Sequence, residues 1–272
     1  MHLMFSGGLV RAFGLAVLLS CGSGAASAQP KPYEPVAVTY DQSIADDAAL
    51  KALIEKMHLA VAEKKTGAID AALSPDFQVV ECDNDPTKTC TPTLKGALRS
   101  NPKLPPPARL RAALCCRDIA PAKITRALRE ETVLGLIGAA LEEETLGAHP
   151  ALPGLACLPA WPMFDAGKAA AMAMAGDVEP ANLRVTALEI VLREKPATEA
   201  AVLVRIAKGQ MVPLVTDLAE SLPDGWTAIA APQGRLGYTD QLGLNEIAPG
   251  GLCFARNAAG QWQIALSVLR RS

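Results

Sequence analysis

The first half of the chain carries apolar residues every three or four positions, a period that predicts amphipathic helices. The clearest stripe includes Leu50 and Met57 and predicts a helix from Asp46 to Lys65. The same spacing predicts further helical segments at residues 68–73, 94–99, 108–116, 122–146 and 165–175. Among these helices, residues 77–81 predict one short strand, and the prolines of residues 147–162 predict a loop.

From Gly176 onward the pattern changes to alternating apolar and polar residues with many β-branched side chains, which predicts strands. The predicted strands are residues 185–192, 201–206, 211–215, 225–230, 236–239, 252–256 and 261–268. The last two form a hairpin around residues 257–260, in which Trp262 and Ile264 alternate towards one face. We expect this hairpin to pair with the strand at residues 77–81 and to be pinned to the helical region by Cys253.

The amino terminus has the three parts of a secretory signal peptide. Arg11 gives the positive charge, residues 12–19 form a short apolar core, and Ala26-Ser27-Ala28 is a small-x-small cleavage site. The core is far shorter than the roughly 20 residues that span a bilayer. The sequence therefore predicts a mature chain that starts at Gln29 in the periplasm or outside the cell. Pro, Gly or charge interrupts every later apolar run, so no membrane span is expected.

A competing cleavage site precedes Cys21. The run Leu18-Leu19-Ser20-Cys21 resembles a bacterial lipoprotein box, in which Cys21 is lipidated and becomes the first mature residue. Leu19 stands where such boxes usually have a small or β-branched residue, which favours simple cleavage. A lipoprotein is the alternative.

The mature chain is nearly neutral. Removal of the leader takes away one basic residue, Arg11, and no acidic one, so the formal charge moves from −2 to −3. The absence of a basic run argues against a nucleic-acid partner and against electrostatic binding to anionic lipid.

Six cysteines follow the leader, an even number that in an exported chain indicates a disulfide framework. They are Cys82, Cys90, Cys115, Cys116, Cys157 and Cys253. Cys82 and Cys90 flank a short polar loop and are predicted to bond. A bond between the neighbours Cys115 and Cys116 is strained, so these two are predicted to reach Cys157 and Cys253.

Between Leu188 and Leu244 a series of sequence marks follows a fixed order. The marks are Leu192-Arg193-Glu194-Lys195-Pro196, Val202 to Lys208-Gly209, Met211 to Val215, Gly225-Trp226 and Gly234-Arg235-Leu236-Gly237-Tyr238. Together they resemble the bacterial SH3-like domain. The resemblance implies a small β-barrel whose turns need glycine and whose interior is filled by Trp226 and alternating aliphatic side chains.

SH3-like modules that hold peptides or cell-wall bridges generally use several exposed aromatic residues. This segment offers only Trp226 and Tyr238, which are weak binding candidates because both stand at positions expected to pack inward. The resemblance therefore implies a reduced or relocated ligand surface, and a role in binding or in structural bracing.

The predicted fold class is α+β, with a mainly helical domain followed by a small SH3-like β-barrel and a C-terminal β-hairpin. The predicted organisation is a signal peptide at 1–28, a linker at 29–41, a mainly helical domain with disulfides at 42–177, the barrel at 178–246 and the hairpin at 247–272.

Enzyme chemistry finds little support in the residues. His58 and His149 are the two histidines of the mature chain, and a cysteine peptidase would need Cys115 or Cys116 beside His149. A structural disulfide with a loop histidine is the favoured interpretation, and His58 is interpreted as a residue at the edge of its helix's apolar stripe.

An acidic loop after the 77–81 strand raises the question of calcium. Glu81, Asp83 and Asp85 lie close together, but a calcium loop that starts at Asp83 places Lys88 where Gly is required and Leu94 where Glu is required. No catalytic residue, metal or cofactor is therefore predicted.

These observations predict an exported, non-enzymatic envelope protein whose partner is peptidoglycan or an envelope protein. A cell-wall hydrolase or cysteine peptidase and a lipoprotein accessory subunit are the alternatives.

Overall fold

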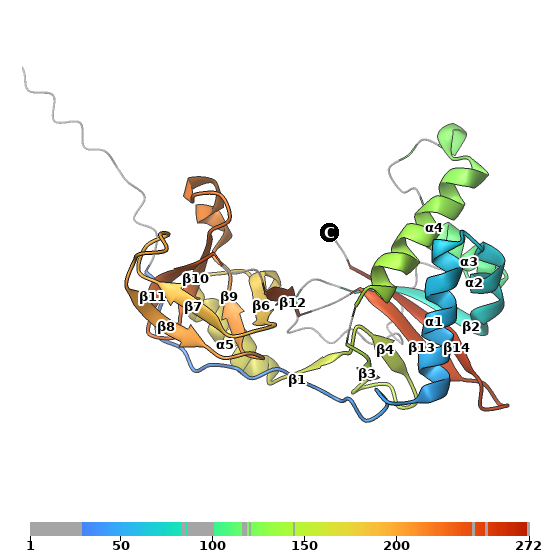
Figure 1. The fold of residues 1–272 in the computed structure, drawn as a ribbon, viewed down its shortest axis with the longest axis horizontal. Coiled ribbons are helices and arrows are strands. Elements are labelled where there is room, and N and C mark those ends of the chain that lie inside the picture. The colour runs from blue at the N-terminus through green and yellow to red at the C-terminus, as the bar shows by residue number, and fades with distance from the viewer. Residues whose placement is uncertain are drawn as a thin grey trace, which may run out of the picture.

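The chain folds into two lobes that lie side by side (Figure 1). A computed structural model describes residues 29–82, 85, 101–115, 119, 121–143, 145–240, 243–247 and 250–270. We call residues 41–163 with 250–270 the five-stranded lobe, and residues 164–247, which interrupt it in the sequence, the insert lobe. Both lobes contain helices and sheets, so the predicted α+β class is confirmed.

The five-stranded lobe is built on one mixed sheet with the strand order β2-β14-β13-β4-β3. Its strands are β2 (Leu73–Cys82), β3 (Gly147–Ala148), β4 (Ala156–Leu158), β13 (Gly251–Arg256) and β14 (Trp262–Arg270). β14 lies between β2, to which it is parallel, and β13, to which it is antiparallel. Val268 of β14 stands opposite Val80 of β2, so the predicted pairing of the last strand with the strand at residues 77–81 is confirmed.

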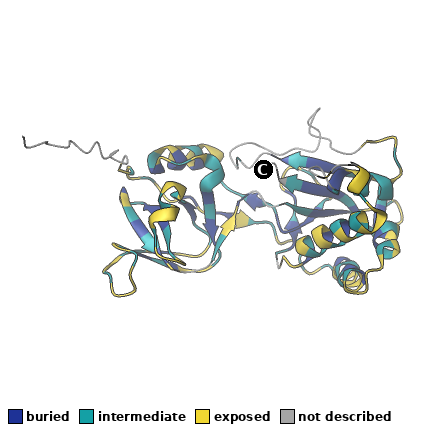
Figure 2. Cartoon of the chain, turned by 90° about the horizontal axis from the view of Figure 1, so that it is seen from above, coloured by how far each residue is buried: buried dark blue, intermediate teal, exposed yellow. Residues whose placement is uncertain are grey.

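Four helices cover one face of this sheet. They are α1 (Ala48–Ala62), α2 (Thr66–Ala72), α3 (Pro106–Leu114) and α4 (Arg126–Leu141), with a short 3-10 turn, η1 (Pro121–Lys123), before α4. Leu50 and Met57 of the predicted stripe are fully buried and share a core with Phe77 and Phe254 of the sheet. Figure 2 shows the exposed residues of these helices on the side away from the sheet. The helices predicted there are confirmed, and residues 94–99 lie outside the described residues.

Two details of the sequence prediction change in this lobe. The helix predicted at 122–146 is shorter, because the Thr125 side chain caps α4 by accepting a hydrogen bond from the Leu128 N–H. Gly138 does not break this helix; a Cβ there would lie 3.2 Å from Val61 of α1, so glycine lets the two helices approach closely. The loop expected at 147–162 contains β3 and β4, and their pairing with each other and with distant β13 explains the error.

A half-buried arginine ties three of the helices together. Arg111 of α3 donates to the Asp70 carboxylate of α2 at 2.7 Å and to Glu130 of α4 at 2.8 Å. The Arg111 side chain is only 18% exposed, which reduces solvent screening of the pairs. Hydrogen bonds from Arg111 lower the pKa of the Glu130 carboxyl below its usual range.

A second polar cluster ties the start of α1 to the C-terminal strands. Asp47 caps α1 by accepting from the Leu50 N–H at 2.9 Å, and it also accepts from Trp262 Nε1 at 3.1 Å. Arg256 donates to the same carboxylate and lies 4.9 Å from the centre of the Trp262 ring. Helix α1 and the strands β13 and β14 are therefore fixed to each other by residues more than 200 positions apart in the sequence.

The insert lobe consists of two small sheets and one helix. Its strands are β6 (Leu183–Thr186), β7 (Ile190–Arg193), β8 (Val202–Ile206), β9 (Met211–Pro213), β10 (Thr227–Ala231), β11 (Arg235–Thr239) and β12 (Leu244–Glu246). The sheet orders are β10-β11-β7-β8 and β12-β6-β9. The helix is α5 (Ala166–Gly176), and the 3-10 turns η2 (Pro180–Asn182) and η3 (Thr216–Ser221) lie between strands.

The two small sheets meet at a bridge between Leu214 and Ile229, and the described strands are not closed into a barrel. The single strand predicted at 185–192 is wrong. A bend at residues 187–189 divides it into β6 and β7, which belong to different sheets.

Helix α5 packs within the insert lobe. Ala169 and Met172 share a core with Leu183 and Met211 of the strands that follow, and a Cβ on Gly176 would lie 2.8 Å from the Pro213 side chain. The domain boundary predicted near Gly176 would therefore separate α5 from the strands on which it packs.

The segment predicted as a linker runs along the insert lobe as an extended strap, which we define as residues 30–40. Its backbone pairs with the lobe at several points, including Lys31 N–H to Ala175 O at 2.7 Å and Val38 N–H to Gly209 O at 2.8 Å. The Tyr33 hydroxyl donates to Ala230 O at 2.7 Å. The strap ends in β1 (Thr39–Tyr40), which pairs with β5 (Pro162–Met163) where the two lobes meet.

Two strap residues should contribute to the stability of the insert lobe. Val36 and Val38 are 3% and 6% exposed and belong to the core that α5 shares with the strands. We expect Val36→Ala with Val38→Ala to reduce the free energy of unfolding by about 3 kcal/mol in urea titrations. The exposed neighbour substitution Ala37→Ser is the control. An unchanged unfolding midpoint in the double variant would mean that the strap is not packed in solution.

Candidate functional site

The two aromatic residues predicted as weak binding positions lie at the paired strands β10 and β11. Trp226 precedes β10 and Tyr238 lies in β11; both are half-buried. The interior of the small sheets is filled instead by aliphatic side chains such as Ile190, Leu192 and Ile229, and neither ring belongs to that core. The expectation that both rings pack into the interior is therefore wrong, because short aliphatic residues already fill the small space.

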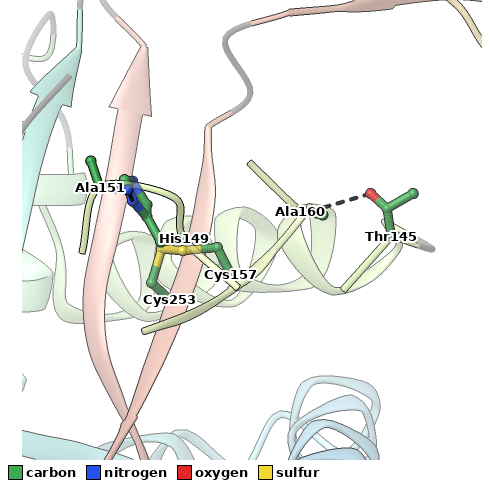
Figure 3. The surroundings of a disulfide bond; sticks show 6 residues. All are labelled: Thr145, His149, Ala151, Cys157, Ala160 and Cys253. Carbon is green, nitrogen blue, oxygen red and sulfur yellow. Dashed lines mark hydrogen bonds between the residues drawn. A yellow bond between two sulfur atoms is a disulfide. The ribbon is translucent and has the colours of Figure 1, made fainter. Parts of the chain in front are cut away.

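A disulfide bond joins the strands that precede and follow the insert lobe in the sequence. Cys157 of β4 and Cys253 of β13 stand directly opposite each other in the sheet and are bonded, although they are 96 positions apart in the sequence (Figure 3). The predicted bridges from Cys115 and Cys116 to these two residues are wrong, since cross-strand pairing brings Cys157 and Cys253 together. Cys82 and Cys115 each also take part in a disulfide bond. Cys90 and Cys116 lie outside the described residues, and so does the predicted Cys82–Cys90 bond.

His149 packs beside this disulfide and is not arranged as a catalytic base. Its ring centre lies 4.6 Å from that of Trp161, and Nδ1 accepts a hydrogen bond from the Ala151 N–H at 3.1 Å. His149 is 5% exposed, and burial lowers its pKa from 6.5 to about 4. The proposed dyad with Cys115 is not available, because a disulfide-bonded cysteine has no thiolate. His58 is half-buried on α1, as expected for a residue at the edge of its stripe.

The acidic loop after β2 gives no metal centre that can be described. Glu81 is the last residue but one of β2 and Asp85 follows the strand, whereas Asp83, Lys88 and Leu94 lie outside the described residues. Across the described ranges, no three His, Cys, Asp or Glu side chains are grouped so as to hold a metal ion.

The strongest candidate site is a cleft of about 370 Å³ where the two lobes meet. The five-stranded lobe contributes Glu143 and Thr145, which follow α4, and the insert lobe contributes Asn245 and Glu246 of β12. Tyr40 of the strap completes the polar lining. Prolines and small apolar residues form the rest of the wall, so the cleft combines an apolar surface with a few polar groups, as ligand sites generally do.

Local backbone contacts fix the walls of this cleft. The Ala160 N–H donates to Thr145 O at 2.7 Å and lies 3.3 Å from Thr145 Oγ1, the contact drawn in Figure 3. Tyr40 is held by the pairing of β1 with Pro162 of β5, and Glu246 is held by the pairing of β12 with β6. Five stretches of sequence thus meet at one cleft, which no local motif could reveal.

The charged groups of the cleft are acidic. Glu143 makes no hydrogen bond or ion pair with any residue that the structure describes. Glu246 lies 4.0 Å from Arg184 Nη2, at the limit of an ion pair. Burial raises the pKa of Tyr40 above its usual value, so its hydroxyl is protonated at neutral pH and can donate a hydrogen bond.

No protein-family model, curated protein or solved structure matches the chain. The functional assignment therefore rests on the residues of the cleft. Among the described residues, no helix is long and apolar enough to cross a bilayer.

The Cys157–Cys253 bond should stabilise the fold strongly. A cross-link that closes a loop of this length reduces the entropy of the unfolded chain, so replacing both cysteines by alanine should cost about 4 kcal/mol. Urea unfolding of the oxidised protein and of the double variant measures this difference. A loss below about 1 kcal/mol would contradict a structural role for this bond.

His149 should make stability depend on pH. As the pH falls from 6.5 towards 4, the unfolded chain takes up a proton at His149 that the folded chain does not bind, so the free energy of unfolding falls. His149→Phe keeps a ring beside Trp161 and should flatten this dependence. Unfolding curves at pH 8, where the histidine is neutral in both states, give the packing contribution alone. Parallel pH profiles for the two proteins would refute the assignment.

Proposed function

We propose that the protein is an exported, non-enzymatic binding protein of the cell envelope, in which an SH3-like insert lobe and the five-stranded lobe hold a ligand between them. The observation that carries this proposal is the cleft at the lobe junction, whose polar groups come from both lobes and from the strap. The same junction explains how the insert lobe could also brace the protein.

Three glycines support the SH3-like assignment of the insert lobe. Gly209, Gly225 and Gly234 have φ angles of +77°, +81° and +72°, which residues with a side chain rarely adopt. All three stand at turns that the SH3-like resemblance implies. Gly237 of β11 supports it further, because a Cβ there would lie 3.0 Å from Leu192 of β7. The described strands are not closed into a barrel, so the assignment rests on these turns and on the close packing at Gly237.

Disulfide chemistry supports an oxidising location. Cys157, Cys253, Cys82 and Cys115 are all bonded, and such bonds persist outside the reducing cytoplasm. Simple cleavage after Ala28 would leave the strap, which starts at residue 30, next to the new amino terminus.

Intact mass and binding test this function together. The protein recovered from the periplasm or medium should begin at Gln29, carry no lipid and expose free thiols only after reduction. The purified protein should cosediment with peptidoglycan or be cross-linked to an envelope protein that is identified by mass spectrometry. A lipid on Cys21 would favour the lipoprotein alternative, and release of soluble fragments from peptidoglycan would favour a hydrolase. Failure to bind either class of partner would overturn the binding function.

A further inference from the structure

A second, apolar hollow adjoins the cleft. It has a volume of about 270 Å³ and lies between α4 and the strands β13 and β14. Its aliphatic lining includes Leu114, Leu136, Ile137, Leu252 and Leu269. Leu136 is 42% exposed, so the hollow is open to solvent at a large apolar side chain.

The two hollows share the lining residues Glu143 and Gly250, and we treat them as one groove. One end of the groove is aliphatic, Glu143 stands in the middle, and Glu246 lies at the polar end. No Lys, Arg or His lines either hollow among the residues described. The groove therefore offers apolar area next to negative charge.

The position of Glu143 strengthens the attraction for a cation. It follows the C-terminal end of α4, where the helix dipole is negative and favours positive charge. Arg184 compensates at most Glu246 and does not line the groove. A ligand cation would thus meet, in Glu143, a carboxylate that has no partner among the described residues.

Neutral polar groups of the groove distinguish between possible ligands. The Tyr40 hydroxyl and the Asn245 amide make no side-chain hydrogen bond within the described part of the chain. Both can pair with the backbone amides of an extended peptide. A simple cationic amphiphile, with a single charged head, would leave these groups without partners.

Resting on the proposed binding function, we infer that this groove binds an extended peptide segment in which aliphatic side chains lie next to a basic residue. The aliphatic side chains occupy the hollow beside Leu136. The basic side chain lies between Glu143 and Glu246, and the peptide backbone pairs with Tyr40 and Asn245.

Fluorescence anisotropy with labelled peptides tests the inference. The probes are Leu-Ala-Leu-Gly-Lys and the reversed order, each with blocked ends, and matched peptides in which Glu replaces Lys. The oxidised mature protein should prefer a Lys peptide, and Glu143→Gln or Glu246→Gln should weaken its binding by about threefold or more. Glu142→Gln, a change in the exposed neighbour of Glu143 that does not line the groove, should have no effect.

A second pair of variants tests the aliphatic end. Leu136→Ser should weaken binding of the Lys peptide, whereas Leu59→Ser, at a residue 55% exposed on α1, should not. Circular dichroism and unfolding midpoints confirm that each variant is folded. Equal binding of Lys and Glu peptides, or no binding of either, would overturn the inference.

The test also separates this inference from the function on which it rests. Envelope partners that are still bound by the Glu143→Gln, Glu246→Gln and Leu136→Ser variants would leave the proposed function standing and defeat the groove assignment. Binding of the Lys peptide without binding of any envelope partner would support the inferred peptide site in the groove and defeat the proposed function in the cell envelope.

Discussion

The fold depends on the pairing of its last strand with an early one. β14 lies inside the sheet, parallel to β2 on one side and antiparallel to β13 on the other, so its backbone forms hydrogen bonds with both strands. Neither neighbour can complete the sheet before the C-terminal residues arrive. Buried side chains alternate between two cores, with Ile264 facing the helices and Val268 the opposite side. An early and a late segment of the chain are thereby joined in one sheet, and the insert lobe is a long insertion between strands of that sheet.

That excursion explains why the lobe junction is the place for a ligand. The insert lobe leaves the sheet after β5 and returns at β13, and the Cys157–Cys253 bond lies at its base. The strap crosses the same junction and adds Tyr40 to the cleft. The two crossings of the chain between the lobes and the strap, which is hydrogen-bonded to the insert lobe, therefore limit how far the lobes can separate, so the cleft is largely formed before a ligand binds. A preformed site loses less entropy on binding.

Part of this arrangement could be predicted from the sequence, because strong periodicity reflects burial on one face. The Leu50 stripe and the last strands are such cases, and α1 and β14 are where the pattern places them. The two- and three-residue strands β3 and β4 are too short to show a period. Six cysteines allow many pairings, and the cross-strand position of Cys157 depends on a register that the sequence does not encode locally. The cleft was missed for the same reason, since Glu143 and Glu246 belong to no common motif.

Hydrogen exchange of the oxidised protein tests the central role of β14 most directly. Amides in a strand paired on both sides exchange only when the sheet opens, so Leu266 and Val268 should be protected nearly to the limit of global unfolding. The Ala258 amide, in the exposed turn before β14, has no hydrogen bond among the described residues and provides the fast-exchanging reference. Slow exchange of the two β14 amides is the expected result. Exchange of those amides as fast as in the turn would show that the last strand does not complete the sheet, and the account would fail.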